Sequence, residues 1–301
     1  MGGADAAGVV LSEIRELLVF GDSLSDGGNA RAALGDGAFS CPPHWNNCRC
    51  DGPLWVDHLA SGFGLPPLLP SLAGGGNHSF GGARSGAGTT HKGLPNLLTQ
   101  VEGFLGEERG QEHGGVDNVL PAAARAPSTL ASTTLVVLRA GANDYLDAPP
   151  SPAVADAVNR HLLVAVNALA DRGLRRFLVP SELPWGFCPI VLPGVGEPER
   201  RALNGLIERQ NVALRQALVE LAGRRGLVVF QPDFHGLFLR IQAEPGAWGF
   251  RELSRPVLGD GGELGVPDAQ GFLWWDAWGH LTSAFHLLLA GRAVGELQGA
   301  D

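Results

Sequence analysis

The sequence predicts an α/β fold in which a parallel sheet carries helices on both faces. Four short runs are apolar without alternation, as strands buried on both faces are. The segments between them have helical periodicity, and one of these, with apolar positions from Val154 to Leu169, ends at Gly173, a typical C-terminal residue of helices. The four strand-like runs are residues 17–20, 135–138, 177–179 and 227–230.

Further elements follow from the same periodicity. The region from 35 to 93 is rich in Gly and Pro and has no clear period, so it is interpreted as long loops around two short elements. Loops of this length in an α/β domain tend to be functional. The additional predicted elements are helices over about 54–61, 154–171, 199–224 and 283–297, and a short strand near 77–80.

The composition of the 301 residues excludes several classes of protein. Hydrophobic residues make up 45% and charged residues 18%, the opposite of a disordered chain. No apolar run approaches the roughly 20 residues that a membrane-spanning helix needs. The net charge is −9 and Lys92 is the one lysine, so a clustered basic face for nucleic acid is not expected.

The domain organisation is simple. We find no internal repeat and no linker, so the sequence predicts one domain over residues 1–301, with residues 1–16 as a poorly ordered N-terminal extension. These first residues lack a basic segment followed by an apolar core, and they are therefore not a secretory signal peptide.

The cysteines leave three interpretations open. Cys41, Cys48 and Cys50 lie close together, and Cys188 lies far along the chain. Two disulfides can form in three ways. A zinc site would add His44 to the first three, although two ligands in a Cys-x-Cys pair are tight for one tetrahedral ion. Plain thiols are the third interpretation, and we predict no metal.

Polar residues with catalytic chemistry follow the predicted strands. Ser23 comes directly after the first strand, where a following helix would favour negative charge beside its hydroxyl; the alternative is an inert helix N-cap. Asn143 follows the second strand and is available as an oxyanion donor. Asp276 and His280 stand close together near the C-terminus. These residues form a coherent set for acyl transfer.

Four blocks of this sequence resemble the GDSL-type lipases and esterases of the SGNH hydrolase superfamily. They occur in the family's order and together span nearly the whole chain. The blocks are FGDSLSDGGN (20–29), NHSFGGARSG (77–86), GAND (141–144) and WWDAWGHLTSAFH (274–286).

The resemblance implies a fold, a reaction and a set of roles. The fold is a three-layer flavodoxin-like sandwich with a five-stranded parallel sheet. The reaction is hydrolysis of a small-molecule or lipid ester without a metal or cofactor. Ser23 is then the nucleophile and His280 its base, and Asp276 orients the histidine. The oxyanion hole consists of the Ser23 and Gly82 N–H groups and the Asn143 amide.

The last block departs from the family pattern. Three residues separate Asp276 from His280 where the family has two, and Leu281 replaces the proline that follows the histidine. Either a wider turn lets Asp276 reach the ring, or a backbone carbonyl near Ala277 orients it and leaves a Ser–His dyad. His286 also matches a histidine of the family, for which we expect a packing or surface role.

Other residues near the four blocks admit two interpretations each. Trp275 and Trp278 are candidates for substrate binding beside His280, although packing under the sheet edge would also explain tryptophans in this block. The acidic residues Asp22, Asp26 and Asp144 adjoin the blocks, and hydrogen bonds within turns and caps account for them.

The four blocks do not distinguish between several activities, because these activities use the same catalytic residues. A carbohydrate O-acetyl esterase and a lysophospholipase or acyltransferase are alternatives to a lipolytic esterase. A catalytically inactive ligand-binding protein on the same scaffold is the alternative outside enzymes. Many relatives are exported, which favours a secreted protein whose signal peptide is absent from this sequence, with the cytoplasm as the other location.

Overall fold

A computed structural model describes residues 13–35, 43–46, 48–107, 133–191, 193–259, 263–265 and 269–299. Its centre is a parallel sheet in the order β1–β2–β3–β4. The sheet register pairs Phe20 with Leu138, Val137 with Leu178, and Leu178 with Phe230. The strands are β1 (Glu16–Gly21), β2 (Thr134–Arg139), β3 (Arg176–Leu178) and β4 (Val228–Phe230).

The fifth strand predicted near 77–80 is reduced to a single bridge between Val19 and Asn77. The segment still runs parallel beside β1, because the Val19 N–H donates to the Gly76 carbonyl at 2.9 Å and the His78 N–H donates to the Val19 carbonyl at 2.7 Å. A Cβ at Gly76 would lie 2.3 Å from the Leu17 carbonyl oxygen, so only glycine permits this approach. With this segment in the outer position, the order of the sheet is that of flavodoxin-like folds.

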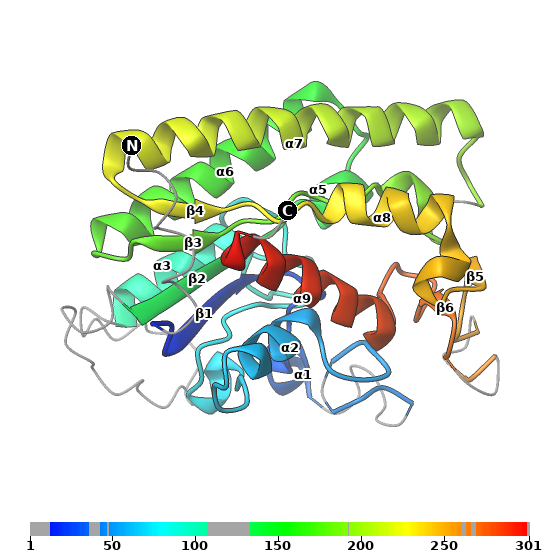
Figure 1. Cartoon of the computed structure of the whole chain (residues 1–301), viewed down its shortest axis with the longest axis horizontal. Coiled ribbons are helices and arrows are strands. Elements are labelled where there is room, and N and C mark those ends of the chain that lie inside the picture. The colour runs from blue at the N-terminus through cyan, green and yellow to red at the C-terminus, as the bar shows by residue number, and fades with distance from the viewer. Residues whose placement is uncertain are drawn as a thin grey trace.

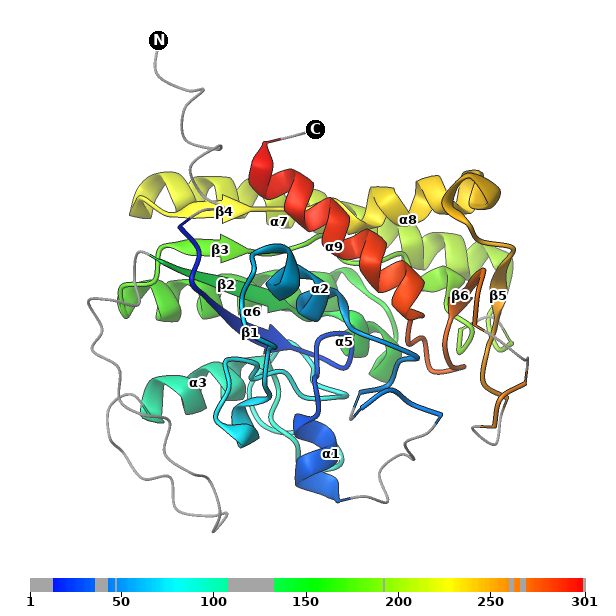
Figure 2. The ribbon, with the colours of Figure 1, turned by 60° about the horizontal axis from the view of Figure 1, so that its bottom comes forward.

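Helices cover both faces of the sheet and make it the middle of three layers (Figure 1). Helices α6 and α7 lie on one side, together with α3, and α2, α8 and α9 lie on the other (Figure 2). The larger helices are α2 (Trp55–Gly62), α3 (Leu97–Glu107), α6 (Pro152–Asp171), α7 (Glu197–Arg225), α8 (Phe234–Ala243) and α9 (Ser283–Gln298). The helices predicted near 54–61, 154–171, 199–224 and 283–297 are thereby confirmed.

Alternation along β1 and β2 divides the core into two clusters. Leu17 and Val19 face the cluster that contains α2, α8 and α9, whereas Leu18 and Phe20 face the cluster of α3, α6 and the C-terminal half of α7. Each side chain is nearly or fully buried. The unbroken apolar runs of the sequence therefore arise because both faces of the sheet are covered.

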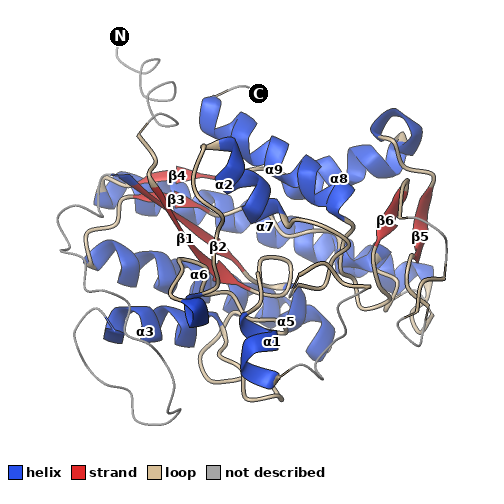
Figure 3. Cartoon of the chain, turned by 90° about the horizontal axis from the view of Figure 1, so that it is seen from below, coloured by secondary structure: helices blue, strands red, loops and turns tan. Residues whose placement is uncertain are grey.

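Shorter elements gather near the carboxyl ends of the strands. They are α1 (Asn29–Leu34), α5 (Ala142–Asp147), and a separate parallel pair formed by β5 (Glu252–Pro256) and β6 (Phe272–Trp274) (Figure 3). Among the described residues, none of the helices is both long and apolar enough to cross a membrane.

Candidate active site

Ser23 lies in a tight turn directly after the carboxyl end of β1. The Ser25 N–H donates to the Asp22 carbonyl at 3.0 Å and closes the turn. Gly21 allows the chain to pass close to β2, because a Cβ there would lie 2.5 Å from the Arg139 carbonyl oxygen. The turn leaves the Ser23 side chain half-buried at the edge of the sheet where ligands bind in α/β folds.

The helix expected directly after Ser23 begins only at Asn29 and has six residues. Asp26 is the reason, because its carboxylate accepts the N–H groups of Gly28 at 2.8 Å and Asn29 at 2.7 Å. Ser23 is therefore not a helix N-cap. The argument that a helix dipole favours charge at Ser23 does not apply to this turn either.

Ser23, His280 and Asp276 form a continuous chain of hydrogen bonds. His280 Nε2 lies 2.9 Å from Ser23 Oγ. On the other side of the ring, His280 Nδ1 lies 2.8 Å from Asp276 Oδ1 and 2.7 Å from Oδ2. A carboxylate can only accept, so Nδ1 carries the proton and Nε2 faces the serine as an acceptor. This is the arrangement a serine nucleophile requires.

The extra residue between Asp276 and His280 is accommodated by a wide turn. Asp276 Oδ1 accepts the N–H groups of Trp278 at 3.0 Å and His280 at 3.2 Å. Gly279 adopts φ of 95°, and a Cβ on it would lie 2.4 Å from Cys188 Sγ. The carboxylate, and not a backbone carbonyl near Ala277, therefore contacts the imidazole.

Charge around Asp276 keeps it ionised. Burial alone would raise the pKa of this carboxyl, but the charge of His280, hydrogen bonds from its ring and backbone, and the charge of Arg49 together lower the pKa below its ordinary value. Arg49 Nη1 lies 3.7 Å from Asp276 Oδ2. An ionised carboxylate stabilises the imidazolium that forms when His280 accepts a proton.

The Asn143 side-chain amide uses one of its two N–H groups to bind the protein. It lies in α5, and its Nδ2 donates to the Ala83 carbonyl at 2.9 Å. A side-chain amide carries two N–H groups, so the second remains for an oxyanion. The contact also fixes the amide against the 81–86 loop, which contains Gly82.

The 81–86 loop passes close to Ser23 at Gly81, the residue before Gly82. A Cβ on the preceding Gly81 would lie 3.8 Å from Ser23 Cβ, and Gly82 has φ of 81°, which favours glycine. In the part of the chain that the structure describes, no acceptor engages the backbone N–H of Ser23 or of Gly82. Both groups are available to a developing oxyanion.

A family model described as GDSL-like Lipase/Acylhydrolase matches residues 17–293. The chain belongs to this family of ester hydrolases. The match includes all four blocks and every candidate catalytic residue.

Individual relatives are distant. A GDSL esterase/lipase of Arabidopsis thaliana is 28% identical over 58% of this chain and 52% of its own length, so the aligned part spans about half of that relative. A second one from the same plant is 22% identical over 94% of this chain and 88% of its own. A solved α/β hydrolase from the metagenome of Lake Arreo, Spain, is 14% identical, covers 97% of this chain and 98% of that one, and has a TM-score of 0.46.

Two acidic residues of the GDSL blocks bind the 81–86 loop, and Asp26 does so in addition to the expected cap hydrogen bonds at the start of α1. Asp26 accepts the Gly81 N–H at 2.8 Å, and burial raises its pKa to about 6 against four backbone hydrogen bonds that lower it. Asp144 accepts the Ser85 N–H at 2.8 Å and the Ser85 hydroxyl at 2.7 Å. The first and third GDSL blocks are thus tied to the second.

A buried cluster of charged residues lies beside the turn that carries Ser23. The sequence analysis did not predict it. Arg139 donates from Nη1 to both Asp22 oxygens at 2.8 and 2.7 Å, and from Nη2 to Glu182 at 2.6 Å. Burial raises the pKa of Glu182, which the charge of Arg139 opposes. An arginine at the end of a buried apolar strand was the signal, because such a charge requires partners.

The tryptophans and His286 occupy different environments. Trp275 is 2% exposed, and its indole N–H donates to His44 Nδ1 at 2.9 Å, so it supports the catalytic loop and is not available to substrate. Trp278 is 64% exposed. His286 is fully buried, and its Nδ1 accepts the backbone N–H of Trp55 at 3.2 Å, consistent with a packing role.

Among the described residues, the cysteines Cys48, Cys50 and Cys188 are all buried. No disulfide joins any two of these three cysteines. Cys41 lies outside the described residues. In the part of the chain that is described, no group of three or more His, Cys, Asp or Glu side chains is arranged to hold a metal ion.

If Asn143 donates to the oxyanion, we expect Asn143→Ala to lower kcat about 10²–10³-fold through the loss of that donor. KM changes little, since the donor acts mainly in the transition state. Steady-state kinetics on a p-nitrophenyl ester measures both, and circular dichroism checks folding. A tenfold or smaller loss of kcat in a folded variant would remove Asn143 from the oxyanion hole.

Proposed function

We propose that this protein hydrolyses carboxylic esters through an acyl-enzyme on Ser23. The observation that carries the proposal is the unbroken hydrogen-bond chain from Asp276 through His280 to Ser23 Oγ. Family membership supports the same reaction class.

Each residue of the chain has one task in the proposed reaction. Ser23 Oγ attacks the ester carbonyl carbon while its proton moves to His280 Nε2, and the carbonyl electrons move to oxygen. Collapse of the tetrahedral intermediate breaks the ester C–O bond, and the leaving alcohol takes the proton from His280. Water then attacks the acyl-serine by the same route and releases the acid and free Ser23.

The oxyanion is proposed to bind the N–H groups of Ser23 and Gly82 and the second amide hydrogen of Asn143. These donors come from three blocks that are far apart in sequence. Because Ala83 and Ser85 are bonded to Asn143 and Asp144, the donors are held before substrate binds. Preorganisation of this kind avoids reorganisation in the transition state.

The inactive ligand-binding scaffold is disfavoured, because the one observation behind it no longer supports it. That alternative rested on the unusual spacing of Asp276 and His280, and the two side chains nevertheless meet at 2.7 Å. A carbohydrate O-acetyl esterase and a lysophospholipase or acyltransferase remain as alternatives with the same catalytic residues. We also propose export as the location, on the family resemblance, with the cytoplasm as the alternative that cell fractionation would reveal.

The experiment that tests the proposed function is active-site labelling with an alkyl fluorophosphonate. Attack by Ser23 Oγ on phosphorus expels fluoride and leaves a stable phosphonyl-serine. We expect one adduct per chain, located on Ser23 by peptide mass spectrometry, and loss of p-nitrophenyl ester hydrolysis in step with labelling. An adduct on Ser25 or elsewhere, or full activity in a fully labelled protein, would contradict the proposal.

A further inference from the structure

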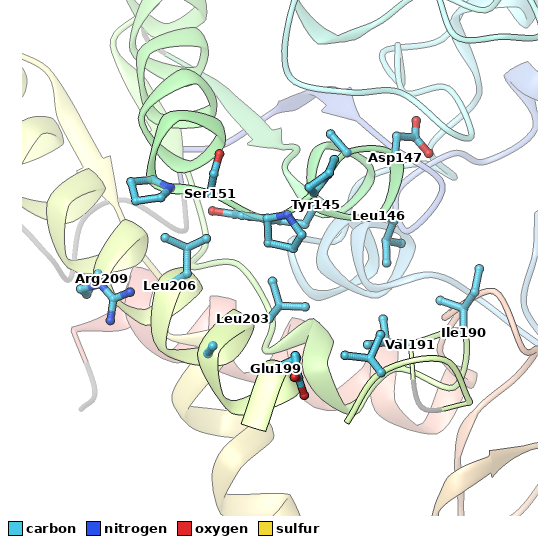
Figure 4. A pocket seen from close by; sticks show the side chains of 16 residues that line it. Tyr145, Leu146, Asp147, Ser151, Ile190, Val191, Glu199, Leu203, Leu206 and Arg209 are labelled. Carbon is cyan, nitrogen blue, oxygen red and sulfur yellow. The ribbon is translucent and has the colours of Figure 1, made fainter. Parts of the chain in front are cut away.

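The short helix α5 carries Asn143, the candidate side-chain donor of the oxyanion hole, and one side of this helix is poorly packed. Tyr145 and Leu146, near its end, border an apolar pocket of about 790 Å³ that α7 lines as well (Figure 4). A side that borders open space contributes few packing contacts, and α5 has only six residues. The position of α5 therefore depends on polar contacts, one of which joins the Tyr145 hydroxyl to Gln210 Oε1 at 2.6 Å.

A second polar contact ties α5 to the 81–86 loop through Ser85, a fully buried residue. Asp144 accepts the Ser85 N–H at one carboxylate oxygen and the Ser85 hydroxyl at the other, at 2.8 and 2.7 Å. Asp144 is the neighbour of Asn143 in the chain, and Ser85 follows Gly82 by three residues. The Ser85–Asp144 contact therefore helps to set the position of one candidate oxyanion donor relative to another.

His161 of α6 contacts the same serine from a third segment. Its Nδ1 lies 2.9 Å from Ser85 Oγ. The serine hydroxyl has one proton, which it donates to the Asp144 carboxylate, so its oxygen accepts the N–H of His161 Nδ1. The imidazole also lies against the loop backbone, because a Cβ on Gly86 would be 3.3 Å from His161 Cε1. His161 therefore holds both the Ser85 hydroxyl and the backbone that follows it.

The ionised form of Asp144 depends on these donors. Burial raises the pKa of this carboxyl, and the two hydrogen bonds from Ser85 and the charge of His161 oppose the rise. If the Ser85 hydroxyl turned away, one buried carboxylate oxygen would lose its donor, which is costly. His161 disfavours that rotation, because the rotation would break the hydrogen bond from His161 as well.

The backbone of the 81–86 loop also has anchors that do not involve His161. The Arg84 carbonyl accepts the Leu97 N–H at 2.9 Å, and the Gly86 carbonyl accepts the Leu98 N–H at 3.1 Å. We therefore expect the loop to stay folded when His161 is replaced, while the Ser85 hydroxyl loses its fixed orientation.

We propose that His161 is a positioning residue for the oxyanion hole: it holds Ser85 against Asp144 and thereby fixes Asn143 relative to Gly82. The proposal rests on the proposed ester hydrolysis and extends it to a residue outside the four GDSL blocks. Its effect is expected in kcat, because the oxyanion donors act mainly in the transition state. A small displacement of a catalytic group can cost tenfold to about 10²-fold in rate.

The test compares three replacements of His161 by steady-state kinetics on a p-nitrophenyl ester. His161→Leu removes the donor, and we expect kcat to fall about tenfold or more with little change in KM. His161→Asn places an amide N–H near the position of Nδ1 and is expected to keep kcat within about threefold of the parent. His161→Gln carries the same amide one bond farther out and is expected to lose kcat as His161→Leu does. His58→Leu is the control, since His58 is also a half-buried helical histidine, on α2, and it keeps the parent kcat.

A double variant distinguishes positioning from a general loss of stability. In Ser85→Ala there is no hydroxyl for His161 to hold, so the addition of His161→Leu is expected to lower kcat no further. Circular dichroism checks the folding of each variant, and the comparison of His161→Asn with His161→Gln decides the question if His161→Leu does not fold.

Three results would overturn the proposal for His161 alone: an unchanged kcat in folded His161→Leu, equal losses in His161→Asn and His161→Gln, or losses that multiply in the double variant. Absence of hydrolysis and of fluorophosphonate labelling in the parent protein would overturn the proposed function instead.

Discussion

Replacing Asp276 with asparagine lowers kcat about 10⁴-fold near neutral pH, with little change in KM. An asparagine amide can donate to His280 Nδ1 and thereby move the ring proton to Nε2, the nitrogen that lies 2.9 Å from Ser23 Oγ. A protonated Nε2 cannot accept the serine proton. Steady-state kinetics on a p-nitrophenyl ester measures the loss.

The size of this loss distinguishes a triad from a dyad. If a backbone carbonyl oriented the imidazole, Asp276→Asn would cost less than tenfold, and that result would contradict the role given to Asp276. Asp171→Asn provides the control, because this carboxylate is 69% exposed and lies at the end of α6, paired with Arg225. It changes the same charge without touching the site and keeps the parent kcat.

Replacing Arg139 with methionine lowers the free energy of unfolding by about 3–5 kcal/mol. The guanidinium is 2% exposed and pairs with both Asp22 and Glu182, so its removal leaves two buried carboxylates without their cation. Urea unfolding followed by circular dichroism measures the change. We expect kcat to fall as well, since Asp22 immediately precedes Ser23 in the nucleophile turn.

The pH dependence of this variant follows from Glu182. Burial raises the pKa of Glu182 and the charge of Arg139 opposes that rise, so the pKa rises further in Arg139→Met. The folded variant then binds more protons than the unfolded chain, and its stability is lost as pH rises through the raised pKa. Below neutral pH, Arg139→Met therefore regains part of the stability that it has lost relative to the parent protein.

Two comparisons make the prediction specific. Arg255→Met removes a cation that is 79% exposed and paired with Glu252, and it changes stability by at most about 1 kcal/mol. At neutral pH, the double variant Arg139→Met/Glu182→Gln loses less free energy of unfolding than Arg139→Met alone, because it buries one unpaired carboxylate fewer. Equal stability of Arg139→Met and Arg255→Met would show that the buried cluster does not stabilise the fold.

Much of the fold was predictable because its signals are local. Strands covered on both faces appear as unbroken apolar runs, and the long helices appear as periodic ones, so β1 to β4, α6, α7 and α9 were expected near their observed places. The outer strand was harder, since its pairing depends on how closely Gly76 can approach Leu17 across the sheet. Local sequence does not encode that distance.

The chemical identity of the candidate site was also predictable, because Ser23, Asn143 and His280 each follow the end of a strand or stand in a block with a family pattern. The contacts that hold these residues were not predictable. Asp26 bonds to Gly81 and Asp144 bonds to Ser85, each across more than fifty residues of chain. Turn and cap hydrogen bonds explain the same acids equally well until the fold brings the loops together.

The fold class, the family and the residue types at the carboxyl edge of the sheet follow from local sequence, because periodicity and motif spacing are properties of short segments. The acid that contacts His280 is set by long-range packing, since Gly279 in the wide turn lies against Cys188. Long-range packing also decides that Trp275 is buried while Trp278 is exposed. Burial and hydrogen-bond partners are set by segments distant in the chain, and they exist only once the chain has folded.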